Sequence, residues 1–165
     1  MREIWLLVPI ILPILTGMVI LLIRPKKRGV LWWITGTGVT LTSAAIFLLA
    51  LYPPVGRLVL FSFGNKMVFS LGADGLSRVF AAMIAFLWPL TTMYSFEYMK
   101  HEGRENKFFC CFSITYGVVT GIAFAGSLIT MYFFYELMTF ITLPMVMHSM
   151  DKKAVYAGKK YLPFP

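Results

Sequence analysis

Long uncharged segments constrain the fold of this chain more than any other feature. Charged side chains are absent from Ile4–Ile23, Val30–Tyr52 and Val79–Phe96, and the block Phe108–Met150 contains only one, Glu136. An α-helix needs about 20 apolar residues to cross a hydrocarbon layer of about 30 Å. Because backbone groups must be satisfied within each span, the pattern predicts an all-α membrane protein.

Composition supports the same fold class. Of the 165 residues, 59% are hydrophobic and 13% are charged, and the mean hydropathy is +0.78. Soluble domains carry about 25% charged residues. The first uncharged run lacks a basic leading segment and a small-residue cleavage site, so we interpret it as a retained helix. No internal repeat or linker divides the sequence, and residues 1–165 are expected to form one transmembrane helical bundle.

The block Phe108–Met150 is about twice as long as one membrane span. Gly126 and Ser127 lie near its middle and indicate a break, so the sequence predicts about five transmembrane helices. On this division Glu136 lies about eight residues, or about 12 Å, into the fifth helix. A carboxylate at such a depth costs about 2.5 to 3.5 kcal/mol on insertion scales and marks a functional site by default. Glu136 is therefore the predicted proton or cation site.

Basic residues divide unevenly between the predicted loops. Eleven of the 15 Lys and Arg residues follow helices one, three and five. Positively charged loops stay in the cytoplasm, so we expect a multi-pass protein of the cell membrane with its N-terminus outside and its C-terminus inside. The net charge of +8 is then a topology signal, and no nucleic-acid partner is expected. The eleven residues are Arg24, Lys26, Lys27, Arg28, Lys100, Arg104, Lys107, Lys152, Lys153, Lys159 and Lys160.

The segment Leu58–Leu71, between the second and third predicted helices, alternates weakly around Gly64-Asn65. This pattern is typical of a β-hairpin. An irregular segment on the membrane surface fits the same residues, because an isolated hairpin is marginal without packing. Asp74 and Ser77 are the candidate N-caps of the third helix.

Patterns typical of enzymes and metal sites are absent from the sequence. Cys110 and Cys111 are adjacent, which fits neither a simple disulfide framework nor a spaced ligand motif, and we interpret them as small buried hydrophobic residues. No phosphate-binding loop and no nucleophile with a base at a readable spacing occurs. We therefore predict no catalytic residue, no cofactor, no metal and no self-contained active site. The run Gly36-Thr37-Gly38 indicates close helix packing instead.

Four motifs occur in order from the third predicted helix onwards: LGADGLSRVF, YSFEYM, FFYELMTF and AVYAGKKYL. With these motifs the chain resembles, over about Leu71 to Leu162, the N-terminal part of proton-translocating, antiporter-like membrane subunits. That family includes large membrane-arm subunits of respiratory complex I, subunits of multi-subunit Na⁺/H⁺ antiporters and membrane subunits of energy-converting hydrogenases.

The resemblance implies a role for one residue in particular. Glu136 matches the family's essential glutamate of the fifth transmembrane helix, which pairs with a lysine of the seventh. Tyr135 replaces the family's usual tryptophan and keeps an aromatic side chain. Tyr132 and Thr139, one turn to either side, are the expected hydrogen-bonding neighbours of the carboxyl group. The seventh helix has no counterpart here, so we expect a truncated or split N-terminal part of a longer subunit.

The expected function is translocation of protons or Na⁺ within a redox-driven pump or a cation/proton antiporter. Other membrane subunits of the same complex and the lipid bilayer are the expected partners. The resemblance allows membership of an NADH-quinone oxidoreductase-like or hydrogenase complex as a non-catalytic subunit. Two alternatives stay open, namely a non-transporting scaffold or assembly subunit, and an inactive truncated product suggested by the ending Pro163-Phe164-Pro165.

Overall fold

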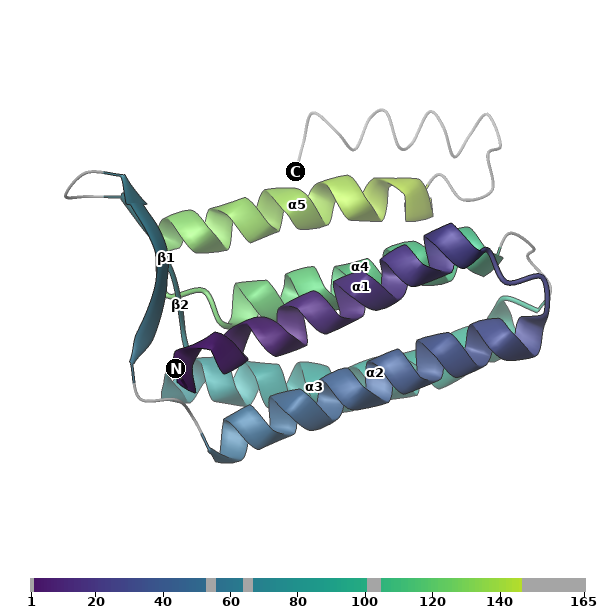
Figure 1. The fold of residues 1–165 in the computed structure, drawn as a ribbon, viewed down its shortest axis with the longest axis horizontal. Coiled ribbons are helices and arrows are strands. Elements are labelled where there is room, and N and C mark those ends of the chain that lie inside the picture. Colours follow the sequence, from purple (N-terminus) through teal and green to yellow (C-terminus); the bar gives the residue numbers. More distant parts are fainter. Residues whose placement is uncertain (1, 53–55, 64–66, 101–104, 147–165) are drawn as a thin grey trace.

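A computed structural model describes residues 2–52, 56–63, 67–100 and 105–146. Within them, all five predicted helices and the predicted hairpin are present, and the helices run alternately up and down (Figure 1). The expected mostly helical membrane fold is thereby confirmed. The elements are a 3-10 turn at Arg2–Leu7, α1 Val8–Ile23, α2 Arg28–Leu51, β1 Arg57–Phe63, β2 Met67–Gly72, α3 Gly75–Tyr98, α4 Glu105–Ala123 and α5 Leu128–Val146.

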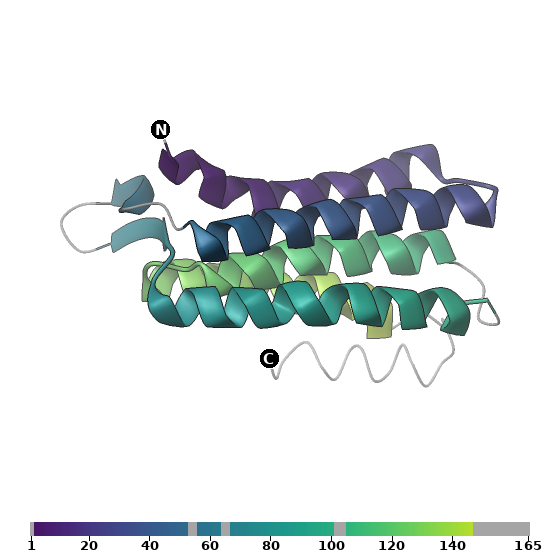
Figure 2. The ribbon, with the colours of Figure 1, turned by 90° about the horizontal axis from the view of Figure 1, so that it is seen from below.

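Helix α4 occupies the middle of the bundle. It packs against α1 on one side and α5 on the other, while α2 packs against both α1 and α3 (Figures 1 and 2). Four segments of the described chain, those containing α1, α2, α3 and α5, are long and apolar enough to cross a membrane. Helix α4 is less apolar, but ten of its 19 residues are buried. Its neighbours shield it from lipid, which lowers its own need for apolar side chains.

Small residues let α4 approach its neighbours closely. A Cβ atom added to Gly117 would lie 2.5 Å from the Ile10 carbonyl oxygen, and one added to Gly121 would lie 2.6 Å from the Phe134 ring. Helices in membranes associate through such close packing and not through exclusion of water. The buried Thr120 hydroxyl donates to the Tyr116 carbonyl 2.8 Å away within α4, so its polarity is satisfied locally.

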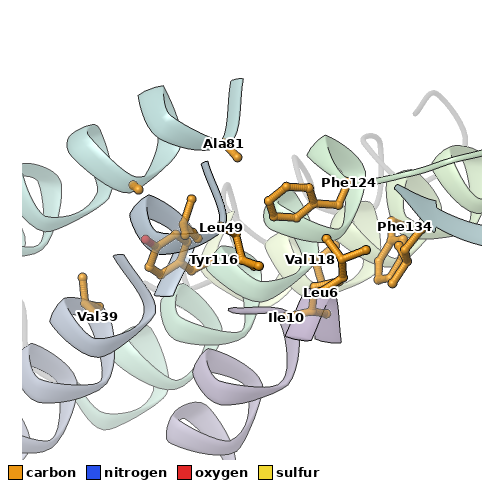
Figure 3. Close-up of a cluster of buried hydrophobic side chains, with 12 residues drawn as sticks. Leu6, Ile10, Val39, Leu49, Ala81, Tyr116, Val118, Phe124 and Phe134 are labelled. Atoms are coloured by element: carbon orange, nitrogen blue, oxygen red, sulfur yellow. The ribbon is translucent and has the colours of Figure 1, made fainter. Parts of the chain in front are cut away.

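The larger of two hydrophobic clusters lies toward the hairpin end of the bundle. Leu6, Tyr116 and Phe124 are all but fully buried in it, and Figure 3 shows them with side chains from α1, α2, α3 and α5. The Tyr116 hydroxyl is hydrogen-bonded to Ser43 of α2 at 2.8 Å, and Trp88 of α3 stacks on the Tyr116 ring with 4.8 Å between ring centroids. This tyrosine therefore joins three helices through one side chain.

A smaller cluster, around Ile20, Leu31 and Phe109, fills the opposite end of the bundle. Cys110 belongs to it and is 5% exposed, as expected for a small hydrophobic residue, whereas Cys111 is half-buried. Both thiols are free.

The two strands form an antiparallel hairpin with partners from Arg57↔Gly72 to Phe63↔Met67. The hairpin interpretation was therefore right. Its turn pair, Gly64-Asn65, lies outside the described residues.

Of the two candidate caps for α3, Asp74 is the one in place. Its carboxylate accepts a hydrogen bond from the Ser77 backbone N–H at 2.7 Å. This bond, with the Ser77 hydroxyl, lowers the pKa of Asp74 below its ordinary value. Ser77 supplies the donor and is not itself the cap. Asp74 therefore has a structural role, as the N-cap of α3.

Candidate ion site in helix α5

The hairpin fixes the point at which α5 begins. The Gly126 N–H donates to the Ser70 carbonyl at 2.8 Å, and the Gly72 N–H donates to the Phe124 carbonyl at 2.9 Å. These two bonds attach the α4–α5 connection to β2 as a short extension of the sheet, next to the bridge between Leu71 and Ala125. The backbone that leads into α5 is therefore held by another element and not by its own turn alone.

Two hydroxyl groups strengthen this attachment. The Ser127 hydroxyl donates to the Val68 carbonyl of β2 at 2.6 Å and accepts from the Thr130 backbone N–H at 3.2 Å, which caps the first turn of α5. The buried Thr130 hydroxyl accepts from the Ser70 N–H of β2 at 3.0 Å. The hairpin thus sets both the height and the rotation of α5. Sequence reasoning assigned the hairpin no part in the site.

One turn further along, Phe134 locks α5 against α4. Its side chain is 8% exposed and packs against Gly121. A Cβ atom at position 121 would overlap the ring, so glycine is the residue that fits there. Phe69 of β2 contacts the same ring at 6.2 Å between centroids. The side chain two residues later, Glu136, is thereby held at a fixed place on the bundle.

Glu136 lies near the middle of α5, eight residues after Leu128 and ten before Val146, as the sequence predicted. At helical rise this is about 12 Å from the start of the helix. The Glu136 side chain is half-buried. Leu137 and Met138 pack against the core on one face, whereas Phe133 and Phe140 are exposed on the other. The carboxyl group can therefore be reached from outside the five described helices.

The two expected neighbours of Glu136 have different geometries. The Tyr132 hydroxyl interacts with the Glu136 carboxylate across one helical turn, although the ring itself is 62% exposed. The Thr139 hydroxyl donates to the Tyr135 carbonyl at 3.3 Å. Because its proton is used there, Thr139 has only acceptor capacity left for a neighbouring group.

Several other charged side chains in the described part of the chain have structural partners near the helix ends. The Arg78 Nε donates to the Ala50 carbonyl oxygen at 2.8 Å, so Arg78 caps the C-terminal end of α2. Glu97 pairs with Lys100, and Glu105 pairs with Arg28. No ion pair of Glu136 occurs among the described residues, and no cluster of potential metal ligands does. Glu136 differs from the other charges in its depth and in its exposed surroundings.

Comparisons with known proteins place this geometry in a family context. Residues 61–109 match the family model described as NADH-ubiquinone oxidoreductase (complex I), chain 5 N-terminus. Subunit A1 of a Na⁺/H⁺ antiporter from Staphylococcus haemolyticus is 31% identical over 97 residues, and the subunit A1 from Staphylococcus aureus is 27% identical over 97 residues. Each of these two matches covers 58% of this chain and 12% of the relative.

The fold has a solved neighbour in the structure of the membrane-bound sulfane sulfur reductase, an archaeal respiratory membrane complex. The TM-score is 0.74 at 17% sequence identity, over 94% of this chain and 32% of the neighbouring chain. The described helices thus repeat an arrangement found in that complex. The chain is therefore similar, in part of its sequence and in its fold, to antiporter-like membrane subunits of the complex I type.

The family match and the candidate site cover different parts of the chain. The match runs from β1 through α3 to the start of α4, and it ends before Glu136. It therefore includes β2 and the Asp74 cap, two features that determine where α3 and α5 begin. The chain spans 12% of the length of the curated relatives and about one third of the structural neighbour.

Proposed function

We propose that this antiporter-like chain takes part in moving protons or Na⁺ across the cell membrane as one subunit of a larger membrane complex, with Glu136 as its ion-carrying residue. The observation that carries the proposal is the place of Glu136, which is half-buried, near the middle of a spanning helix and bounded by an exposed face. A carboxylate in lipid is costly unless it binds a proton, a cation or an ammonium group.

The exposed face of α5 offers the route by which such a partner reaches Glu136. Tyr132, Phe133 and Tyr135 are all exposed around it. An ammonium group from another helix that approached this face would favour the ionised carboxylate, and its withdrawal would favour the protonated form. Movement of that partner would then couple proton occupancy to an event elsewhere in the complex.

The arrangement of the loops supports an orientation with the N-terminus outside. All six described basic residues of the α1–α2 and α3–α4 connections lie at the end of the bundle opposite the hairpin (Figure 1). Three described basic residues lie at the other end, namely Arg2, Arg57 and Arg78, and Arg78 caps α2. By the excess of positive charge, we assign the first end to the cytoplasm.

The test compares two carboxylates in the tagged chain, purified from its native membrane in mild detergent with whatever subunits remain attached. After reconstitution into vesicles with an internal pH dye, we expect Glu136→Gln to abolish ion-coupled proton flux. Glu97→Gln is the matched control, because Glu97 lies in the last turn of α3 with an exposed side chain and should affect flux only weakly.

Equal losses in the two variants would refute the assignment to Glu136. The alternative function is a non-transporting scaffold, favoured by the absence of a basic partner for Glu136 among the described residues. In that case the Glu136→Gln chain would retain the same attached subunits and the complex would show unchanged flux. Mass spectrometry of the purified complex identifies those subunits in either case.

A further inference from the structure

A cleft of about 610 Å³ opens at the end of the bundle opposite the hairpin. It lies between the α1–α2 connection and the first turn of α4. Four basic side chains, those of Arg24, Lys26, Arg28 and Lys107, line it together with one acidic side chain, that of Glu105. Its volume falls within the range of about 300 to 1,000 Å³ that small-molecule sites occupy.

The charges of this basic cleft do not cancel. Arg28 forms an ion pair with Glu105 across it, which uses the one carboxylate of the lining. Within the described part of the chain, Arg24, Lys26 and Lys107 form no ion pair. Among the described residues, three positive charges in one recess therefore have no counter-charge, and like charges held together attract an anion from solution or from a membrane surface.

Hydrogen bonds hold the walls of the basic cleft in position. The Asn106 side-chain amide of α4 donates to the Pro25 carbonyl at 3.1 Å, and Pro25 itself is buried. Arg28 also donates to the Lys100 carbonyl at 3.1 Å. Since these bonds join the α1–α2 connection to the α3–α4 region, the basic groups are arranged before any ligand arrives, which reduces the entropy cost of binding.

The basic cleft has an apolar side as well. The buried side chains Ile20 and Leu31 form its floor, and Leu21 of α1 lines it while being 50% exposed. The exposed Leu22 and Ile23 continue the apolar surface of α1. A basic recess that opens beside an apolar helix face matches a molecule with an anionic head and a hydrocarbon tail.

We propose that the basic cleft binds an anionic phospholipid, with the headgroup phosphate among Arg24, Lys26 and Lys107 and an acyl chain along Leu21. Basic pockets between transmembrane helices take lipid head groups in this way. The first residues of α2 and α4, Arg28 and Glu105, both border the cleft, so two helix N-termini add partial positive charge. The site is independent of Glu136 and of ion translocation.

Native mass spectrometry of the full chain in an uncharged detergent tests the site. Titration with phosphatidylglycerol should give a stoichiometric complex, and phosphatidylcholine should bind more weakly because it has no net charge. Arg24→Gln and Lys107→Gln should each weaken phosphatidylglycerol binding about fivefold, as expected for one basic group near an anionic headgroup. Arg24→Lys should retain binding, because it keeps the charge.

Lys27→Gln is the matched control. Lys27 belongs to the same connection and carries the same charge, but it does not line the basic cleft. Equal weakening by Lys27→Gln, or equal binding of the two lipids, would overturn the proposal. Thermal unfolding with each ligand gives a second check. If inorganic phosphate alone raised the melting temperature as much as phosphatidylglycerol does, the cleft would be a site for free anions and the proposal would also be overturned. Circular dichroism of each variant checks that the helices are retained.

Discussion

At the hairpin end of the bundle, backbone groups of β2 and the α4–α5 connection bond to each other, whereas at the opposite end charged side chains bridge the helices. The first arrangement uses Gly126, Ser70 and Thr130 in fixed geometry. The second uses Arg28 and Glu105, whose side chains are 44% and 13% exposed. One end is held by backbone contacts, and the other carries a cleft of about 610 Å³ lined by basic side chains.

This difference corresponds to a division of roles. Hydrogen bonds between uncharged backbone groups depend little on salt, so we expect the hairpin end to keep the start of α5 in the same place at any salt concentration. Exposed ion pairs contribute little and are screened by salt, so the basic end has charge available for other partners. The candidate ion site thus depends on the hairpin end, and the proposed lipid site depends on the basic end.

The largest effect is expected from removing the aromatic contact that fixes α5. Phe134→Ala should lower the free energy of unfolding toward the lower end of the about 3 to 5 kcal/mol that such truncations cost in cores. We expect the lower end of this range because packing, and not the exclusion of water, holds helices together in lipid. Thermal unfolding in detergent measures it. Phe140→Ala, in the same helix but 65% exposed, is the control and should change little; similar losses would show that α5 is not anchored at Phe134.

A smaller effect is expected from crowding the hairpin contact. A Cβ atom at Gly126 would lie 2.9 Å from the Ser70 hydroxyl and 3.1 Å from its carbonyl oxygen. Gly126→Ala should therefore destabilise the fold by about 1 to 3 kcal/mol. Gly29→Ala at the basic end meets no atom within 4 Å and should be neutral or stabilising by about 0.4 to 1 kcal/mol. If both variants had the same melting temperature, the two ends would not differ in tightness.

The smallest effect concerns the ion pair of the basic end. Arg28→Gln should cost about 1 kcal/mol, because the Arg28 side chain is 44% exposed and ion pairs open to water gain little. The loss should disappear near 1 M salt, where the screening length is about 3 Å. Melting temperatures at low and high salt measure this dependence, with Lys27→Gln as the control. A loss that persisted at high salt would mean that the basic end is held as rigidly as the hairpin end.

Much of the fold was predictable because lipid imposes one simple rule on every span. Uncharged length, together with the break at Gly126-Ser127, located all five helices, and the preference of Asp74 for an N-cap located the start of α3. The run Gly36-Thr37-Gly38 was interpreted as close packing, and this holds for Gly38 but not for Gly36. A Cβ atom at Gly38 would lie 2.5 Å from Thr16, whereas Gly36 faces open space. Composition cannot distinguish the two, because the faces of a helix are assigned by its neighbours.

The candidate site shows the same limit. The depth of Glu136 follows from counting residues along a helix, and so does the spacing of Tyr132 and Thr139. The contact of Phe134 with Gly121 and the bonds from Ser70 to the start of α5 join residues far apart in the chain. No local pattern carries such pairings, so the role of the hairpin could not be found from the sequence.

By itself, the sequence determined that the chain has helices long and apolar enough to cross a membrane, where each helix lies and which carboxylate falls near the middle of one. These follow from the cost of charge in hydrocarbon, which acts on each residue separately. Only the tertiary structure decided that α4 is the central helix, that β2 fixes α5, and that basic residues of two connections share one cleft. Those outcomes depend on close contacts between segments that are far apart in the chain. The shapes of the packed side chains select such contacts, and composition does not.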